Sequence, residues 1–205
     1  MPFFKELNTL FIHIPKTAGI SVNKYLEYKS VIAKYKKFDP LYLSIIKTKL
    51  PKHISYYHHT YNDIKDIYSN FDKKFTIIRN PYDRMISEYF FRMSTCEWKK
   101  NENKTHSEDL ADFIPWFLNN EKNFDNHKLP QYQFIQGIED KITILRFENL
   151  KEDFKNYFNE ELNVNFKYGN YTRSKYQDYY TPQTKELVYN YYQQDFIQFN
   201  YNKEF

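Results

Sequence analysis

The chain has 205 residues, of which 41% are hydrophobic, and a formal net charge of +4 at pH 7. This length is typical of one domain with a buried core, so we expect a single domain spanning residues 1–205. The single cysteine, Cys96, excludes an intrachain disulfide. The mild positive charge suits anionic ligands without requiring nucleic acid, and no apolar run approaches the roughly 18 residues of a membrane span.

The first motif is a strand, a loop and a helix within residues 9–28. Leu10–Ile14 is an apolar, β-prone run, Pro15 turns the chain, and an amphipathic helix follows with Val22 and Tyr25 on one side. The loop between strand and helix consists of Lys16, Thr17, Ala18, Gly19, Ile20 and Ser21. Backbone N–H groups at a helix N-terminus, a lysine and two hydroxyl groups together favour an anion site.

Gly19 is one of only three glycines in the chain, which indicates a backbone that approaches a ligand closely or takes a positive φ angle. The loop is not a nucleoside triphosphatase P-loop, because that motif needs G-x-x-x-x-G-K-[ST]. Here Lys16 precedes the glycine, and no second glycine lies upstream. The sequence therefore predicts a phosphate-binding loop of a different kind.

A pair of histidines follows the next expected strand. His53–Tyr57 has the pattern of that strand, and it ends at His58 and His59. Thr60, with Asp63 three residues later, is typical of a helix N-terminus closed by reciprocal side-chain caps. Because open α/β sheets bind ligands at the carboxyl ends of their strands, the two histidines are candidates for chemistry.

Phe75–Ile78 is the clearest buried strand, and Arg79 follows it directly. Asn80 and Pro81 are typical of the cap and the first turn of a helix, which we expect to include Ser87 about two turns from its start. Arg79 and Ser87 can hold a second anion together. The alternative is that Arg79 forms a structural ion pair, which is the commoner fate of an arginine at a strand end.

The remainder of the chain continues the alternation of helices and strands. We expect a helix after Ser107, a strand over Lys141–Arg146 and a last helix after Thr181 and Pro182. His127 lies in a polar segment, where a solvated loop residue is the simplest interpretation. The pattern as a whole predicts an α/β fold with a mostly parallel sheet.

Several strings in the chain resemble a known family. HIPKTAGIS is similar to the 5′-phosphosulfate loop of sulfotransferases that use 3′-phosphoadenosine 5′-phosphosulfate (PAPS), above all the carbohydrate sulfotransferases of the heparan-sulfate 2-O type. IIRNPYDRMISEYF is similar to their 3′-phosphate motif, and ILRFENL and YYTPQTKELV extend the resemblance along the chain. The resemblance implies a three-layer, P-loop-like α/β fold with a mostly parallel central sheet and helices on both faces.

The resemblance also implies roles for individual residues. Lys16 is then a catalytic residue that stabilises the leaving phosphate, and His59 is the base, with His58 as the alternative. The residues expected to bind the donor are Lys16, Thr17, Ala18, Gly19, Ile20, Ser21, Arg79, Ser87, Arg173, Ser174 and Lys175. For the last three, an ordinary basic surface loop is an equally good interpretation.

The implied reaction is in-line transfer of a sulfuryl group from PAPS to a hydroxyl group of a glycan, releasing adenosine 3′,5′-bisphosphate (PAP), with no metal. Two alternatives stay open: a nucleotide kinase-like phosphotransferase, and a non-catalytic relative that binds anionic glycans. Golgi sulfotransferases carry a membrane anchor, and the chain shows none. We therefore expect either a soluble cytoplasmic protein of microbial or viral origin or a catalytic domain trimmed of its anchor.

Overall fold

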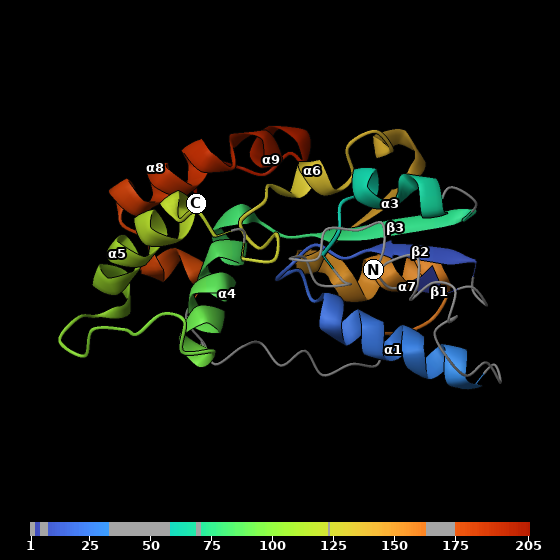
Figure 1. Cartoon of the computed structure of the whole chain (residues 1–205), viewed down its shortest axis with the longest axis horizontal. Helices are drawn as coiled ribbons and strands as arrows, with labels where there is room; N and C mark the ends of the chain where they lie inside the picture. The colour runs from blue at the N-terminus through green and yellow to red at the C-terminus, as the bar shows by residue number, and fades with distance from the viewer. Residues whose placement is uncertain (1–2, 5–7, 33–57, 69–70, 123, 163–174) are drawn as a thin grey trace. The chain divides into compact units, whose positions relative to one another are not determined.

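The computed structural model describes residues 3–4, 8–32, 58–68, 71–122, 124–162 and 175–205 (Figure 1). The chain divides into two compact units, the first formed by Met1–Ile78 with Asp125–Phe166 and the second by Arg79–Phe124 with Lys167–Phe205. Each has a hydrophobic core cluster. The expected strand His53–Tyr57 lies outside the described residues, and the single domain over residues 1–205 stays a prediction.

The first unit contains a four-stranded sheet in the order β1-β2-β3-β4. Its strands are β1 (Phe3–Phe4), β2 (Thr9–Ile12), β3 (Lys73–Ile78) and β4 (Thr143–Arg146). β2, β3 and β4 are parallel, with Phe11 beside Phe75 and Ile77 beside Leu145, whereas β1 pairs with β2 antiparallel. This arrangement confirms the expected α/β fold with a mostly parallel sheet.

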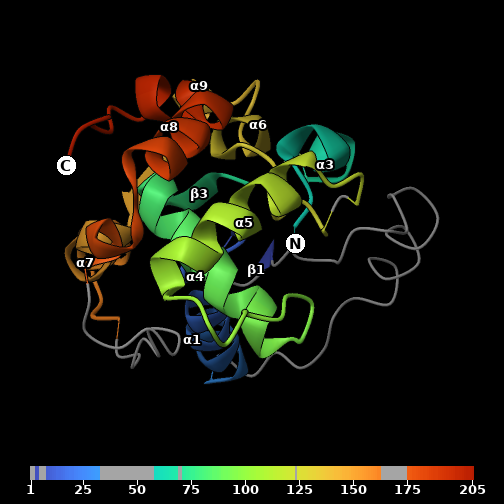
Figure 2. The ribbon, with the colours of Figure 1, turned by 90° about the vertical axis from the view of Figure 1, so that its left-hand side faces the viewer.

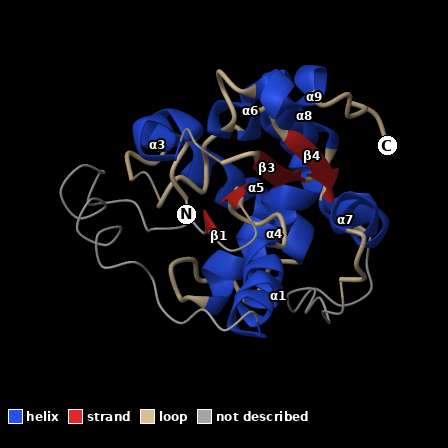
Figure 3. Cartoon of the chain, turned by 90° about the vertical axis from the view of Figure 1, so that its right-hand side faces the viewer, coloured by secondary structure: helices blue, strands red, loops and turns tan. Residues whose placement is uncertain are grey.

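Helices cover both faces of this sheet. The described helices of the first unit are α1 (Gly19–Ile32), α3 (Tyr61–Tyr68), α6 (Gln131–Phe134) and α7 (Leu150–Phe158). One 3-10 turn, Glu139–Lys141, lies before β4, and another, Phe147–Asn149, follows β4. On one face, Phe11, Phe75 and Leu145 form a core with Val22 of α1 and Phe154 of α7. α3 lies on the opposite face from α1 (Figures 1 and 3). Alternate strand residues point to opposite faces, and all four residues of β2 are buried, so both sides of the sheet are covered at this strand.

The start of α3 is fixed by its own first residues. The Thr60 backbone N–H donates to Asp63 Oδ2 at 2.8 Å, and the Asp63 N–H donates to Thr60 Oγ1 at 3.3 Å. These reciprocal bonds satisfy backbone donors that a helix N-terminus leaves unpaired. The cap confirms the prediction from Thr60 and Asp63, and it sets the direction of the chain directly after His58 and His59.

The second unit is helical. It contains α4 (Pro81–Ser94), α5 (His106–Asn119), a 3-10 turn (Tyr176–Tyr179), α8 (Pro182–Tyr191) and α9 (Gln193–Gln198). As predicted, the Asn80 side chain caps α4 by accepting the Tyr82 N–H at 2.9 Å. α4, α5 and α8 pack together around Tyr82, Phe113 and Val188 (Figure 2). Of the helices in the described part of the chain, none is long and apolar enough to cross a membrane.

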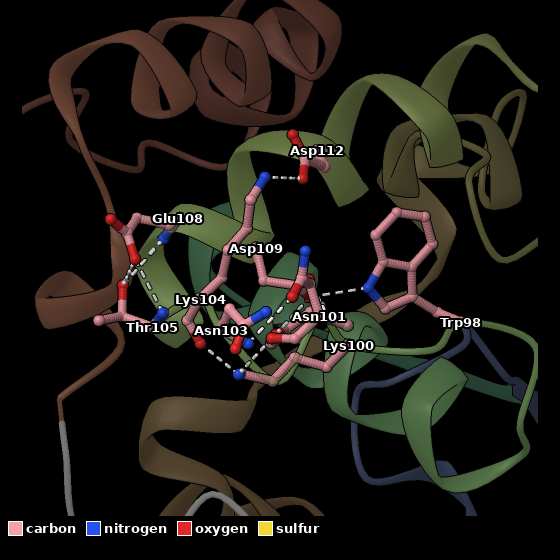
Figure 4. Close-up of polar contacts among 10 residues, drawn as sticks. Trp98, Lys100, Asn101, Asn103, Lys104, Thr105, Glu108, Asp109 and Asp112 are labelled. Atoms are coloured by element: carbon pink, nitrogen blue, oxygen red, sulfur yellow. Dashed lines mark hydrogen bonds and ion pairs between the residues drawn. The ribbon is translucent and has the colours of Figure 1, made fainter.

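A buried carboxylate organises the connection between α4 and α5. Asp109 is 1% exposed and accepts hydrogen bonds from Trp98 Nε1 at 2.8 Å and from the Asn101 backbone N–H at 3.0 Å (Figure 4). The Tyr89 hydroxyl donates to the same carboxylate at 2.9 Å. The sequence placed the start of this helix after Ser107, but α5 begins at His106 because the N-cap is Thr105, whose side chain accepts the Glu108 N–H.

Candidate functional site

The loop that joins β2 to α1 has an unusual backbone. Lys16 and Ala18 both take left-handed conformations, with φ angles of 68° and 73°. Alternation of left-handed and right-handed residues is typical of anion-binding nests, in which successive N–H groups face one side, and the role of this loop in binding an anion stays a prediction. Gly19 begins α1, and the Ser21 N–H closes the turn onto the Ala18 carbonyl at 3.0 Å. The positive end of the helix dipole therefore lies at the same place.

Two loop residues make contacts within the protein that the sequence did not indicate. The Thr17 hydroxyl is buried and donates to the Ile14 carbonyl at 2.8 Å, so this hydroxyl proton supports the loop itself. Gly19 does not have a positive φ. Its close approach is to the His13 imidazole, because a Cβ built at Gly19 would lie 2.0 Å from His13 Cδ2 and Nε2. The Ile20 side chain is exposed.

His13 connects this loop to a cluster of histidines in the same unit. Its ring lies against Gly19 and meets the His58 ring edge-on, with centroids 4.9 Å apart. The His127 ring meets His58 in the same way at 5.0 Å. Burial, with the neighbouring His58 as a second cause, lowers the pKa of His13 well below its usual value. The predicted anion loop and the predicted histidine pair are therefore neighbours.

A carboxylate completes the cluster. Asp125 Oδ2 lies 2.7 Å from His58 Nδ1, and the Asn126 side chain donates to the His58 carbonyl at 2.8 Å. His127 is buried, which corrects the expectation of a solvated loop residue. The sequence carried only a weak signal for this contact, a polar Asp-Asn-His run, because nothing local links it to His58.

His59 occupies a different environment from His58. It is 1% exposed, and among the described residues its Nδ1 has no hydrogen-bond partner. Burial lowers the pKa of His59 to about 4, and the nearby Asp63 carboxylate only partly opposes this. By contrast, 14% of the His58 side chain is exposed.

The cluster also has the composition of a metal site. One ligand atom each from His58, Asp125 and His127 lies within 4.8 Å of the other two. Imidazole and carboxylate ligands suit divalent transition metals. The metal-free reaction expected from the sequence therefore stays a prediction.

In the second unit, Arg79 precedes α4 and is 4% exposed. Its Nε donates to Asp83 Oδ2 at 2.7 Å, one helical turn along, and half-buried Ser87 lies one turn further. The structural ion pair considered from the sequence is thus present, and its carboxylate was recognisable from the i, i+4 spacing. The pair fixes the Nε edge of the guanidinium, and the role of Arg79 and Ser87 in binding a phosphate stays a prediction.

The third group of predicted donor ligands is described only in part. Arg173 and Ser174 lie outside the described residues. Lys175 is exposed and directly precedes the 3-10 turn Tyr176–Tyr179. Its contribution to nucleotide binding likewise stays a prediction.

Comparison with known proteins identifies the family of this chain. A family model described as "Sulfotransferase family" matches residues 3–202. No curated protein matches the chain. The match includes both the anion loop with its histidine cluster and the Arg79 segment.

Proposed function

Because this chain belongs to the sulfotransferase family, we propose that it transfers a sulfuryl group from PAPS to a hydroxyl group of a carbohydrate. The observation that carries the proposal is the position of His13, which contacts both Gly19 of the anion loop and His58. Sulfuryl transfer needs a group that stabilises the leaving phosphate and a base for the acceptor hydroxyl, held close together. One compact unit supplies candidates for both. The carbohydrate acceptor rests on the resemblance of HIPKTAGIS to the loops of carbohydrate sulfotransferases.

The loop would bind the 5′-phosphosulfate of the donor. Its backbone N–H groups, among them those of Thr17 and Gly19, and the N-terminus of α1 favour negative charge. Lys16 adds a full positive charge where negative charge develops on the phosphate as the bond to sulfur breaks. Arg79 and Ser87, with Arg173, Ser174 and Lys175, would bind the 3′-phosphate.

For the base, the contacts favour His58 over His59. A general base works best when its pKa lies near the operating pH, and burial lowers the pKa of His59 to about 4. His59 is also 1% exposed, so an acceptor hydroxyl has little access to it. His58 is more exposed and belongs to the cluster that adjoins the anion loop. We therefore assign the base to His58, the alternative that the sequence left open.

The nucleotide is tested by thermal shift. PAP carries phosphates at both the 3′ and the 5′ position of its ribose, whereas AMP and ATP lack the 3′-phosphate. PAP should therefore stabilise the protein far more than AMP or ATP does. A ligand present at 100 times its Kd adds about 2.7 kcal/mol to the free energy of unfolding. Equal shifts with AMP and PAP would remove the 3′-phosphate site from the proposal.

The reaction is tested with radiolabelled PAPS and a panel of unsulfated and partly sulfated glycans. The expected result is label transferred to at least one glycan and PAP released in equal amount. Magnesium-dependent turnover of ATP, with no use of PAPS, would instead identify a phosphotransferase. Tight glycan binding without any PAPS binding would identify a non-catalytic glycan-binding protein.

A further inference from the structure

We propose that Asp125 is the positioning residue of His58 and that the turn Asp125–His127 holds the imidazole of the base in place. The proposal rests on the proposed function, because it assigns a partner to the base of that reaction. Its first observation is the 2.7 Å contact between Asp125 Oδ2 and His58 Nδ1. The two residues are 67 positions apart, so the fold rather than the local chain brings them together.

The backbone of the turn is held in an unusual conformation. Asp125 and Asn126 follow one another with φ angles of 58° and 63°, both left-handed. Consecutive left-handed residues other than glycine cost free energy and persist only where surrounding contacts impose them. Here the contacts converge on one residue, because Asp125 binds the His58 ring and Asn126 Nδ2 donates to the His58 carbonyl at 2.8 Å. The turn thus fixes both the ring and the backbone of His58.

Two further rings enclose the imidazole. His13 and His127 meet it edge-on, with interplanar angles of 77° and 79°. Both are buried, and the rings of His13 and His127 therefore restrict the space around the His58 imidazole. In the described part of the chain, the titratable groups around His58 include His13, His127 and Asp125, with His59 next in sequence. Asp125 is the acidic group among these four, so its carboxylate can stabilise a positive His58.

The contact determines which nitrogen of His58 is the base. A carboxylate accepts a hydrogen bond, so Asp125 favours the tautomer with its proton on Nδ1 and leaves Nε2 as the basic atom. As the acceptor oxygen bonds to sulfur and the bond from sulfur to the PAPS phosphate oxygen breaks, the acceptor proton passes to Nε2. The resulting imidazolium is stabilised by Asp125 and later releases its proton to water. Asp125 itself touches neither donor nor acceptor in this step.

The test combines a spectroscopic measurement with kinetics on the full chain. Nitrogen-15 spectra of the six histidines, with His58 assigned by comparison with His58→Ala, should show the Nδ1–H tautomer. An asparagine amide can donate to Nδ1, so Asp125→Asn should shift His58 toward the Nε2–H tautomer. In the same variant kcat should fall by about 100-fold or more, with unchanged affinity for PAP.

Two companion variants separate positioning from general damage to the fold. Asp140→Asn changes an exposed carboxylate of the same unit and should leave both the spectrum and kcat unchanged. Asn126→Gly keeps a backbone that accepts positive φ but loses the bond to the His58 carbonyl, so kcat should fall while PAP affinity stays normal. Retained PAP affinity in every variant shows that the anion loop is still folded.

Three results would overturn the proposal. The first is an Asp125→Asn variant with the wild-type His58 tautomer and wild-type kcat. The second is wild-type activity that a chelator abolishes and zinc restores, with bound zinc lost in Asp125→Asn, since the cluster would then be a metal site. The third is full turnover in His58→Ala, which removes the base assignment of the proposed function whatever the Asp125→Asn spectrum shows.

Discussion

Replacing Gly19 by alanine tests the junction between the anion loop and the histidine cluster. A Cβ at this position would lie 2.0 Å from two atoms of the His13 ring, whereas carbon atoms in favourable contact stay roughly 3.5–4.0 Å apart. The ring cannot withdraw freely, because it is 3% exposed and stacks on Phe11 with centroids 5.5 Å apart. Either the ring or the first turn of α1 must move.

The balance of terms predicts a net loss of stability. Alanine within a helix is favoured over glycine by at most about 1 kcal/mol, and Gly19 is the first residue of α1, where that gain is smaller. Overpacking a filled interior costs about 1–3 kcal/mol. For a domain of this size each kcal/mol lowers Tm by about 2–4 °C. We therefore expect Gly19→Ala to lower Tm by about 2–10 °C.

A double-mutant cycle with His13→Ala isolates the steric cause. Removing the ring makes room for the new methyl group, so Gly19→Ala should cost at least about 1 kcal/mol less in the His13→Ala background. Urea denaturation of the four proteins at pH 7 measures this difference. Gly137→Ala is the control, because its φ of 89° strains any side chain while the nearest atom to its Cβ lies 4.0 Å away. The control should cost the same in both backgrounds, and an equal cost for Gly19→Ala in both would refute the reasoning.

Three other predictions concern charge. His59 has a pKa of about 4 in the folded protein against 6.5 when exposed. Between these two values the unfolded state binds more protons than the folded state, so the free energy of unfolding falls as the pH drops through this window. Urea denaturation from pH 7 to pH 5 should show a weaker pH dependence of this free energy for His59→Gln than for the wild type. Glu88 and Glu97 both pair with the buried Arg92, but the Glu88 side chain is 3% exposed and the Glu97 side chain 44%. Glu88→Ala should lower the free energy of unfolding by about 3 kcal/mol or more, and Glu97→Ala by about 1 kcal/mol or less. Equal losses in urea denaturation would contradict this. Lys16→Ala should lower kcat for sulfuryl transfer by about 100-fold or more with a small change in PAP affinity, whereas Lys24→Ala, on the exposed side of α1, should change neither.

The sequence by itself determined the local elements. Asn80 and Pro81 start α4, and Thr60 with Asp63 starts α3, because a cap is a bond between residues two or three positions apart. The apolar run Phe75–Ile78 is a buried strand for a similar reason, since the pattern of one segment reports how that segment is buried. The order of these elements was enough to predict a mostly parallel sheet with an anion loop at its edge.

The tertiary structure alone decided how the candidate site is built. Asp125 and His58 are distant in the chain, and the segment around Asp125 has no periodicity to indicate a partner. For the same reason the sequence favoured a solvated His127, although the fold buries it beside His58. The choice between His58 and His59 also depended on burial, which adjacent residues of one polar run do not reveal. Local patterns show which side of an element is buried, but only the packing of elements against one another determines which polar groups meet.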